Sequence, residues 1–105
     1  MEPSISMDDD GIKVQLFGEI DHHTAKGIRE MTDILIQQKR PKNLRLDFAH
    51  VSFMDSSGIG LIMGRYRMMA LYGGCLKVTN VPEGLEKLMI LSGLGALHII
   101  ENRKA

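Results

Sequence analysis

Two adjacent serines, Ser56 and Ser57, are the side chains of this sequence best placed to do chemistry. They follow an extended apolar segment and precede apolar residues that recur with helical spacing. Both hydroxyls are therefore expected at a helix N-terminus, where unpaired backbone N–H groups and about half a positive charge suit a capping hydroxyl and equally suit a phosphate. The run Met54–Leu61 thus predicts either a helix cap or a phosphate site.

Two familiar kinds of site are disfavoured around these serines. The glycines at 58, 60 and 64 follow the spacing G-x-G-x-x-x-G and no Lys-Ser/Thr pair comes after them, so neither nucleotide-binding fingerprint is satisfied. The glycine-x-serine-x-glycine elbow of a hydrolase is absent because Met54 stands two residues before Ser56. We therefore expect a binding protein with no catalytic residue.

The same three glycines need an explanation of their own. Each interior glycine costs a helix roughly 0.5 to 1 kcal/mol relative to alanine, so three in two turns suggest that something comes close to the backbone. For Gly58, beside the serines, we expect an approaching partner. For Gly60 and Gly64, packing of the helix on its own sheet is an equal alternative.

Metal and cofactor sites are not expected. His22 and His23 are adjacent, so on a helix their rings diverge by about 100 degrees and cannot share a metal as an i, i+4 pair can. His50 and His98 are isolated in the sequence. Cys75, the only cysteine, excludes an internal disulfide and fits a reducing cytoplasm.

Length and charge narrow the class of partner. The chain has 105 residues, which predicts one domain, and its 13 basic and 13 acidic residues cancel. Without a broad positive field, we expect no nucleic acid or membrane partner but a protein. No apolar run approaches the roughly 20 residues of a membrane span, and the acidic N-terminus lacks the features of a signal peptide, so we expect a cytoplasmic protein.

The pattern of apolar residues predicts an α/β fold with a mixed, mostly parallel sheet of about five strands and helices packed against it. Strands are expected near residues 4–7, 12–17, 43–48, 75–79 and 96–100, with a hairpin turn at 8–11 and Gly18 ending the second strand. Helices are expected at 21–39, 57–72 and 82–92, the last ended by Gly93.

The second expected helix has apolar residues on two faces. A stripe at helical spacing is assigned to the core and comprises Ile59, Ile62, Met63, Tyr66 and Ala70. An apolar strip with one arginine remains on another face, and such a strip is typical of a protein-docking surface. This strip contains Leu61, Arg65, Met68 and Tyr72, and we expect Gly58, Leu61, Arg65 and Met68 to bind the partner.

Three segments together carry a family resemblance. They are residues 18–25 (GEIDHHTA), 53–60 (FMDSSGIG) and 64–66 (GRY). The sequence closely resembles, over nearly its whole length, the anti-sigma factor antagonists of spore-forming bacteria within the STAS domain family. That family has a mixed sheet with helices, as the apolar pattern also predicts.

The resemblance implies a regulatory switch. The unphosphorylated antagonist would bind an anti-sigma factor that is also a serine kinase and so free a sigma factor; phosphorylation would end binding, and a serine phosphatase would reset the protein. The matching phosphoacceptor is Ser56, with Ser57, Asp55 and Asp21 as its neighbours. A STAS scaffold subunit of a larger stress-signalling assembly is the alternative. Family members usually carry a further helix after the last strand, whereas this chain ends at residues 101–105.

Overall fold

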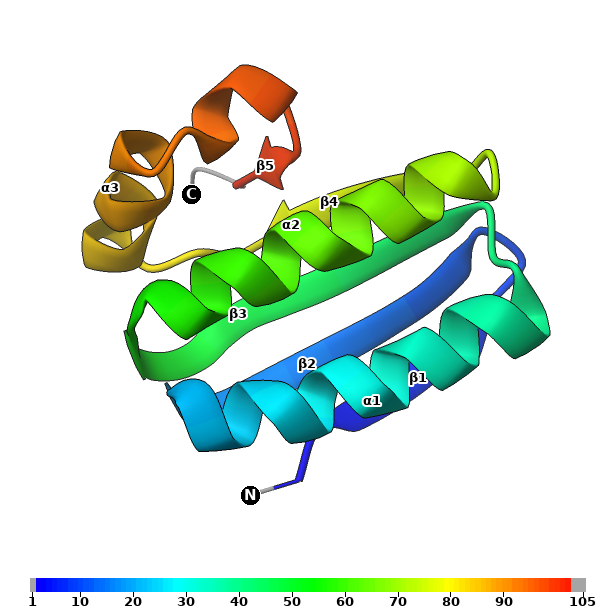
Figure 1. Cartoon of the computed structure of the whole chain (residues 1–105), viewed down its shortest axis with the longest axis horizontal. Helices are drawn as coiled ribbons and strands as arrows, with labels where there is room; N and C mark the ends of the chain where they lie inside the picture. Colours follow the sequence, from blue (N-terminus) through cyan, green and yellow to red (C-terminus); the bar gives the residue numbers. More distant parts are fainter. Residues whose placement is uncertain (1, 103–105) are drawn as a thin grey trace.

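The computed structural model describes residues 2–102 and consists of one five-stranded sheet with helices packed against it. Figure 1 shows α1 and α2 lying side by side over one face of the sheet, with α3 beyond the β4 side. In chain order the elements are β1 (Ser4–Asp8), β2 (Gly11–Ile20), α1 (His22–Lys39), β3 (Asn43–Met54), α2 (Ser56–Leu71), β4 (Cys75–Thr79), α3 (Glu83–Leu91), the 3₁₀ helix η1 (Leu94–Leu97) and β5 (Ile100–Glu101).

The sheet is mixed and mostly parallel, as the sequence predicted. Its strand order is β1-β2-β3-β4-β5; β1 and β2 are antiparallel and every other neighbouring pair is parallel. The predicted hairpin turn joins the antiparallel pair, where the Asp8 carboxylate accepts hydrogen bonds from the backbone N–H groups of Asp10 and Gly11 at 2.8 and 3.0 Å. The parallel pairs need helical crossovers, and these crossovers place α1 and α2 over the sheet.

The core lies between the sheet and the two long helices. Alternate residues of β2 and β3 point toward the helices and are fully buried, as Val14 and Leu46 illustrate. Within residues 2–102, no helix is long and apolar enough to cross a membrane.

Three strands differ from the prediction by more than one residue. The second strand does not end at Gly18 but continues to Ile20, because Gly18 adopts a φ of 75° at an irregularity in the pairing with β3. The third strand extends past Phe48 to Met54. The strand predicted at 96–100 is wrong over most of its length: residues 96 and 97 belong to η1, and β5 comprises only Ile100 and Glu101, which pair with β4. Residues 103–105 of the tail lie outside the described residues.

The predicted helices are all present. The first ends at Lys39 and the third at Leu91, where Gly93 adopts a φ of 94° and its N–H donates to the Ile90 carbonyl at 3.0 Å. The second begins at Ser56, one residue earlier than predicted. This small difference decides which side chain caps the helix.

Candidate functional site

The two segments singled out in the sequence meet at one edge of the sheet. Ile20 and Met54 are direct partners at the ends of the parallel strands β2 and β3, so the turns into α1 and α2 lie side by side. Asp21 follows the first strand and Asp55 the second. The Asp55 N–H donates to the Ile20 carbonyl at 3.1 Å, which ties the two turns together. The sites predicted from separate motifs therefore share one location.

An aspartate caps α2 and not a serine. Asp55 has extended backbone angles, and its carboxylate accepts a hydrogen bond from the Ser57 N–H at 2.8 Å. The interpretation of the serines as the helix cap is therefore wrong. Within residues 2–102, neither serine hydroxyl makes a side-chain hydrogen bond. Ser56 is exposed and Ser57 is half-buried, so the cap leaves an accessible hydroxyl at the first residue of the helix.

The N-terminus of α1 is capped by side chains of its own first turn. The Thr24 N–H donates to the Asp21 carboxylate at 2.9 Å, and the Asp21 N–H donates back to the Thr24 hydroxyl at 2.9 Å. This reciprocal pair is a capping box. Hydrogen bonding from the Thr24 N–H lowers the pKa of Asp21 below its ordinary 3.8, so this carboxylate stays charged beside the Ser56 turn.

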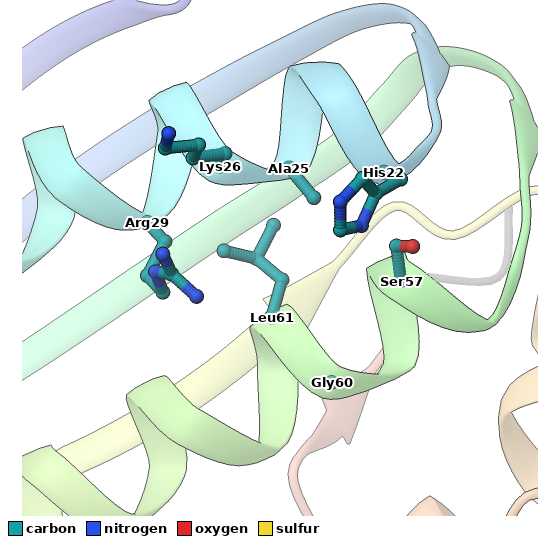
Figure 2. Close-up of a pocket in the computed structure, with 7 residues that line it drawn as sticks. All are labelled: His22, Ala25, Lys26, Arg29, Ser57, Gly60 and Leu61. Atoms are coloured by element: carbon teal, nitrogen blue, oxygen red, sulfur yellow. The ribbon is translucent and has the colours of Figure 1, made fainter.

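A groove of about 290 Å³ separates α1 from α2 beside Ser57. Figure 2 shows the His22 ring of α1 facing Ser57, with Ala25 and Leu61 meeting further along between the helices. The wall formed by α1 carries His22, Lys26 and Arg29, and the wall formed by α2 carries Ser57, Gly60 and Leu61. No carboxylate lines this groove among the described residues, so it favours an anionic group.

A second hollow, of about 610 Å³, lies around the start of α1 and the end of β2. Asp21, Glu19 and Thr24 are among its lining residues. The turn at Asp21 therefore separates an acidic hollow from the cationic groove.

The three glycines of α2 have roles opposite to those expected. Gly58 is buried, and a Cβ there would overlap the Met54 side chain, so internal packing and not a partner requires this glycine. The expectation that Gly58 lies open to an approaching partner is therefore wrong, since the residue is buried beside Met54. A Cβ at Gly60 or Gly64 would meet nothing within 4 Å, so the packing alternative for these two is also wrong. The open approach to the backbone of α2 is at Gly60.

The predicted exposed strip on α2 is largely buried. Leu61 and Arg65 are only 4% and 5% exposed, and Met68 is half-buried; Tyr72, 37% exposed, does lie at the surface. Of the predicted core stripe, Ile62 is fully buried and Ala70 is exposed, while Ile59, Met63 and Tyr66 are half-buried. The buried positions are Gly58, Leu61, Ile62, Arg65 and Met69.

This error has a physical cause. The buried positions recur at helical spacing, but two of them are a glycine and an arginine, so counting apolar residues placed the stripe on the wrong side. The α2 helix also packs against α1, and a pattern within one helix cannot reveal that neighbour.

Arg65, a buried residue of α2, links this helix to α1. Its Nη2 atom lies 2.9 Å from Asp33 Oδ1, and its Nη1 atom donates to the Arg29 carbonyl at 3.4 Å. The contact with Asp33 is an ion pair rather than an aligned hydrogen bond, since Asp33 Oδ1 and Arg65 Nε both lack hydrogen-bond partners in the described chain. Burial lowers the pKa of Arg65, Asp33 opposes this effect and Arg29 adds to it. Arg65 is thus a structural link and not an exposed docking residue.

Sequence reasoning missed the cationic side of the groove. His22, Lys26 and Arg29 are spaced i, i+4 and i+7, so they share one face of α1. That spacing is a signal that could have identified them. The sequence alone does not show that this face of α1 lies beside Ser57 and Gly60.

Comparisons with known proteins agree with the geometry. The STAS domain family matches residues 3–104. An anti-sigma F factor antagonist of Paenibacillus polymyxa is 40% identical over 81 residues, which cover 77% of this chain and 69% of the relative. A structure of the anti-sigma factor antagonist SpoIIAA in its unphosphorylated form has 31% identity and a TM-score of 0.86, with 98% of this chain and 89% of the other covered.

A second structure shows the Bacillus cell fate determinant SpoIIAA in the phosphorylated form, with 31% identity, a TM-score of 0.78, and coverage of 98% of this chain and 92% of the other. The fold, the paired turns and the sequence similarity therefore converge. The chain belongs to the STAS domain family, within its group of anti-sigma factor antagonists.

Proposed function

We propose that this chain is an anti-sigma factor antagonist that acts by binding and not by catalysis. Its unphosphorylated form binds an anti-sigma factor that is also a serine kinase, and this binding frees a sigma factor. The kinase inactivates the antagonist by phosphorylating Ser56, and a serine phosphatase resets it. The names of the relatives support the antagonist role. The observation that carries the proposal is the exposed Ser56, whose hydroxyl is free because Asp55 caps α2.

Ser56 is a better phosphoacceptor than Ser57 on structural grounds. Ser56 is exposed at the first residue of α2, whereas Ser57 is half-buried in the groove wall and its N–H is held by Asp55. A kinase must bring the γ-phosphate of ATP in line with the acceptor oxygen, which requires an accessible hydroxyl. Ser57 is therefore the local competitor and not the first choice.

The phosphate acts on the interface and not on the fold. It adds about −1.5 to −2 charges beside Asp55, with Asp21 on the adjacent turn. The N-terminus of α2 offsets part of this repulsion, by about 0.3 to 1 kcal/mol for an exposed anion, so the folded chain tolerates it. A partner packed against Ser56 would have to bury that charge, which is costly.

The docking surface proposed for the partner is the exposed start of α2 together with the adjoining groove. Gly60 offers the partner access to the helix backbone, and Leu61 contributes the apolar part of the groove wall. Met68 lies half-buried further along α2. Gly58 and Arg65 contribute indirectly, because they fix α2 against Met54 and α1.

The test is incubation of the chain with its anti-sigma factor kinase and ATP, followed by mass spectrometry of the phosphorylated residue. Ser56→Ala should bind the kinase, incorporate no phosphate and stay bound when ATP is added; Ser57→Ala should still be phosphorylated. Ser56→Asp should keep a native circular dichroism spectrum and lose kinase binding. Phosphate mapped to Ser57, or normal binding by Ser56→Asp, would contradict the proposed switch.

A further inference from the structure

The groove between α1 and α2 has an uneven distribution of charge. Its α1 wall carries Lys26 and Arg29, with His22 at the end nearest Ser57. Its lining includes no aspartate or glutamate among the described residues. Two carboxylates of α1 follow these cations: Asp33 is paired with Arg65, and Glu30, four residues after Lys26, makes no ion pair with Lys26 or Arg29 among the described residues. The positive charge of the groove is therefore not neutralised within the described chain, although the whole sequence has a formal net charge of zero.

The opposite wall of the groove is unusually open. Gly60, which lines the groove, is exposed; Gly64, four residues further along α2, is half-buried, and a Cβ at either position would meet nothing within 4 Å. Internal packing therefore does not require glycine at these positions, and both weaken the helix. Their absent side chains let a partner reach the backbone of α2 directly beside the cations of α1.

We infer that this groove receives an acidic segment of the anti-sigma factor partner. Carboxylates of that segment pair with Lys26 and Arg29, while its backbone packs against Gly60. The inference rests on the proposed function, because the groove adjoins Ser56 and would be continuous with the proposed docking surface. It adds the chemistry of the partner, which the relatives' names do not give.

The same arrangement offers a second route by which phosphorylation releases the partner. Ser57 lines the groove and Ser56 precedes it on α2, so a phosphate on Ser56 adds about −1.5 to −2 charges one residue away from the groove wall. Those charges repel the carboxylates of the bound segment and attract the same cations. The phosphate therefore competes with the partner for one set of positive charges.

Charge reversal on α1 tests the inference by calorimetric titration against the anti-sigma factor kinase. Lys26→Glu and Arg29→Glu should each weaken binding at least tenfold, and the salt dependence of the affinity should decrease. The matched control is Lys39→Glu, which makes the same charge change in the last turn of α1 and should alter binding less than twofold. Equal losses for Lys26→Glu and Lys39→Glu would overturn the inference, because net charge alone would then explain the effect.

Substitution of Gly60 tests the other wall without changing any charge. Gly60→Leu should weaken binding at least tenfold while its melting temperature is not lowered, because the added side chain meets open space. Normal kinase binding by a folded Gly60→Leu would contradict a partner packed at this position. Circular dichroism of each variant separates loss of fold from loss of binding.

Two controls separate failure of this inference from failure of the proposed function. If the unmodified chain does not bind the kinase or is not phosphorylated by it, the proposed function fails; if it does both and Lys26→Glu binds equally well, only the groove inference fails. Titrations are repeated without nucleotide. An effect of Lys26→Glu that appears only with bound ATP would overturn the inference in favour of a contact with the nucleotide phosphates.

Discussion

The first turns of α1 and α2 share an aspartate cap but differ in the three residues that follow it, and the third of these decides how the cap is completed. Each helix follows one of two paired parallel strands, and each is capped by an aspartate, Asp21 or Asp55. At the third helical residue α1 has Thr24, whose side chain closes a capping box. At the corresponding residue α2 has Gly58, which has no side chain and packs on Met54.

This difference separates a structural helix start from one that is open to modification. In α1 the Asp21 N–H is satisfied locally by the Thr24 hydroxyl. In α2 the Asp55 N–H is satisfied by the Ile20 carbonyl of the neighbouring strand end, so no hydroxyl of α2 is needed for capping. The Asp55 carboxylate and the Asp55 N–H thus order the start of α2, and the Ser56 hydroxyl is not used for capping.

The starts of α1 and α2 stay side by side only while the two helices keep their packing. Arg65 is expected to stabilise that packing. Arg65→Ala should lower the free energy of unfolding by roughly 2 to 3 kcal/mol, because it leaves Asp33 without its cation and removes buried packing. This is less than the loss for a fully buried pair because the Asp33 side chain is 29% exposed. Urea unfolding measures the change.

The neighbouring exposed arginine provides the control. Arg67→Ala should change the free energy of unfolding by less than about 0.5 kcal/mol, as is usual for surface positions. Arg65→Met, which keeps an apolar side chain of similar length, should recover most of the loss. A fully stable Arg65→Ala would restore the earlier expectation that this arginine is available to a partner.

The swap at the third helical residue probes the comparison directly. Gly58→Thr places in α2 the residue that closes the box in α1, yet it should lower the free energy of unfolding by about 1 to 3 kcal/mol, because its Cβ overlaps the Met54 side chain. The cost should shrink in a Met54→Ala background, and a double-mutant cycle by urea unfolding measures the coupling. A more stable Gly58→Thr in the unmodified background would mean that the glycine serves a partner and not internal packing.

The sequence predicted elements better than it predicted contacts between them. The mixed sheet, the hairpin and all three helices followed from apolar spacing and from turn residues such as Gly93, which act within short segments. The strand expected at 96–100 did not, because His98, with a φ of 57°, helps to keep the segment in a 3₁₀ turn. Here local backbone geometry outweighed an apolar run.

In the candidate site, too, positions at strand ends were predicted better than contacts between helices. The paired turns at Asp21 and Asp55 belong to two of the three segments that carried the family resemblance, residues 18–25 and 53–60. The burial of Leu61 and Arg65 could not be predicted, because it depends on α1 packing beside α2 and on an ion pair with Asp33. Residues that face another helix need the structure, whereas residues at strand ends can be placed from sequence.

The smallest expected effect concerns the charge of the α1 cap. Because the Thr24 N–H hydrogen bond lowers the pKa of Asp21 below its ordinary 3.8, the charged form stabilises the folded chain. This contribution is fully present above pH 3.8 and is lost as the pH falls through the lowered pKa of the folded state. Titration of the Asp21 carboxyl followed by NMR should therefore give a midpoint below 3.8.

Asp21→Asn is the matched variant for this prediction, because asparagine also caps a helix but does not titrate. Its free energy of unfolding at neutral pH should lie close to that of the unmodified chain, and it should lack the part of the acid dependence that comes from Asp21. Asp21→Ala removes the cap itself and should lower the free energy of unfolding at neutral pH more than Asp21→Asn does. An acid dependence identical in the unmodified chain and Asp21→Asn would show that the box at α1 is maintained by hydrogen-bond geometry alone and that the charge of Asp21 contributes nothing to folding.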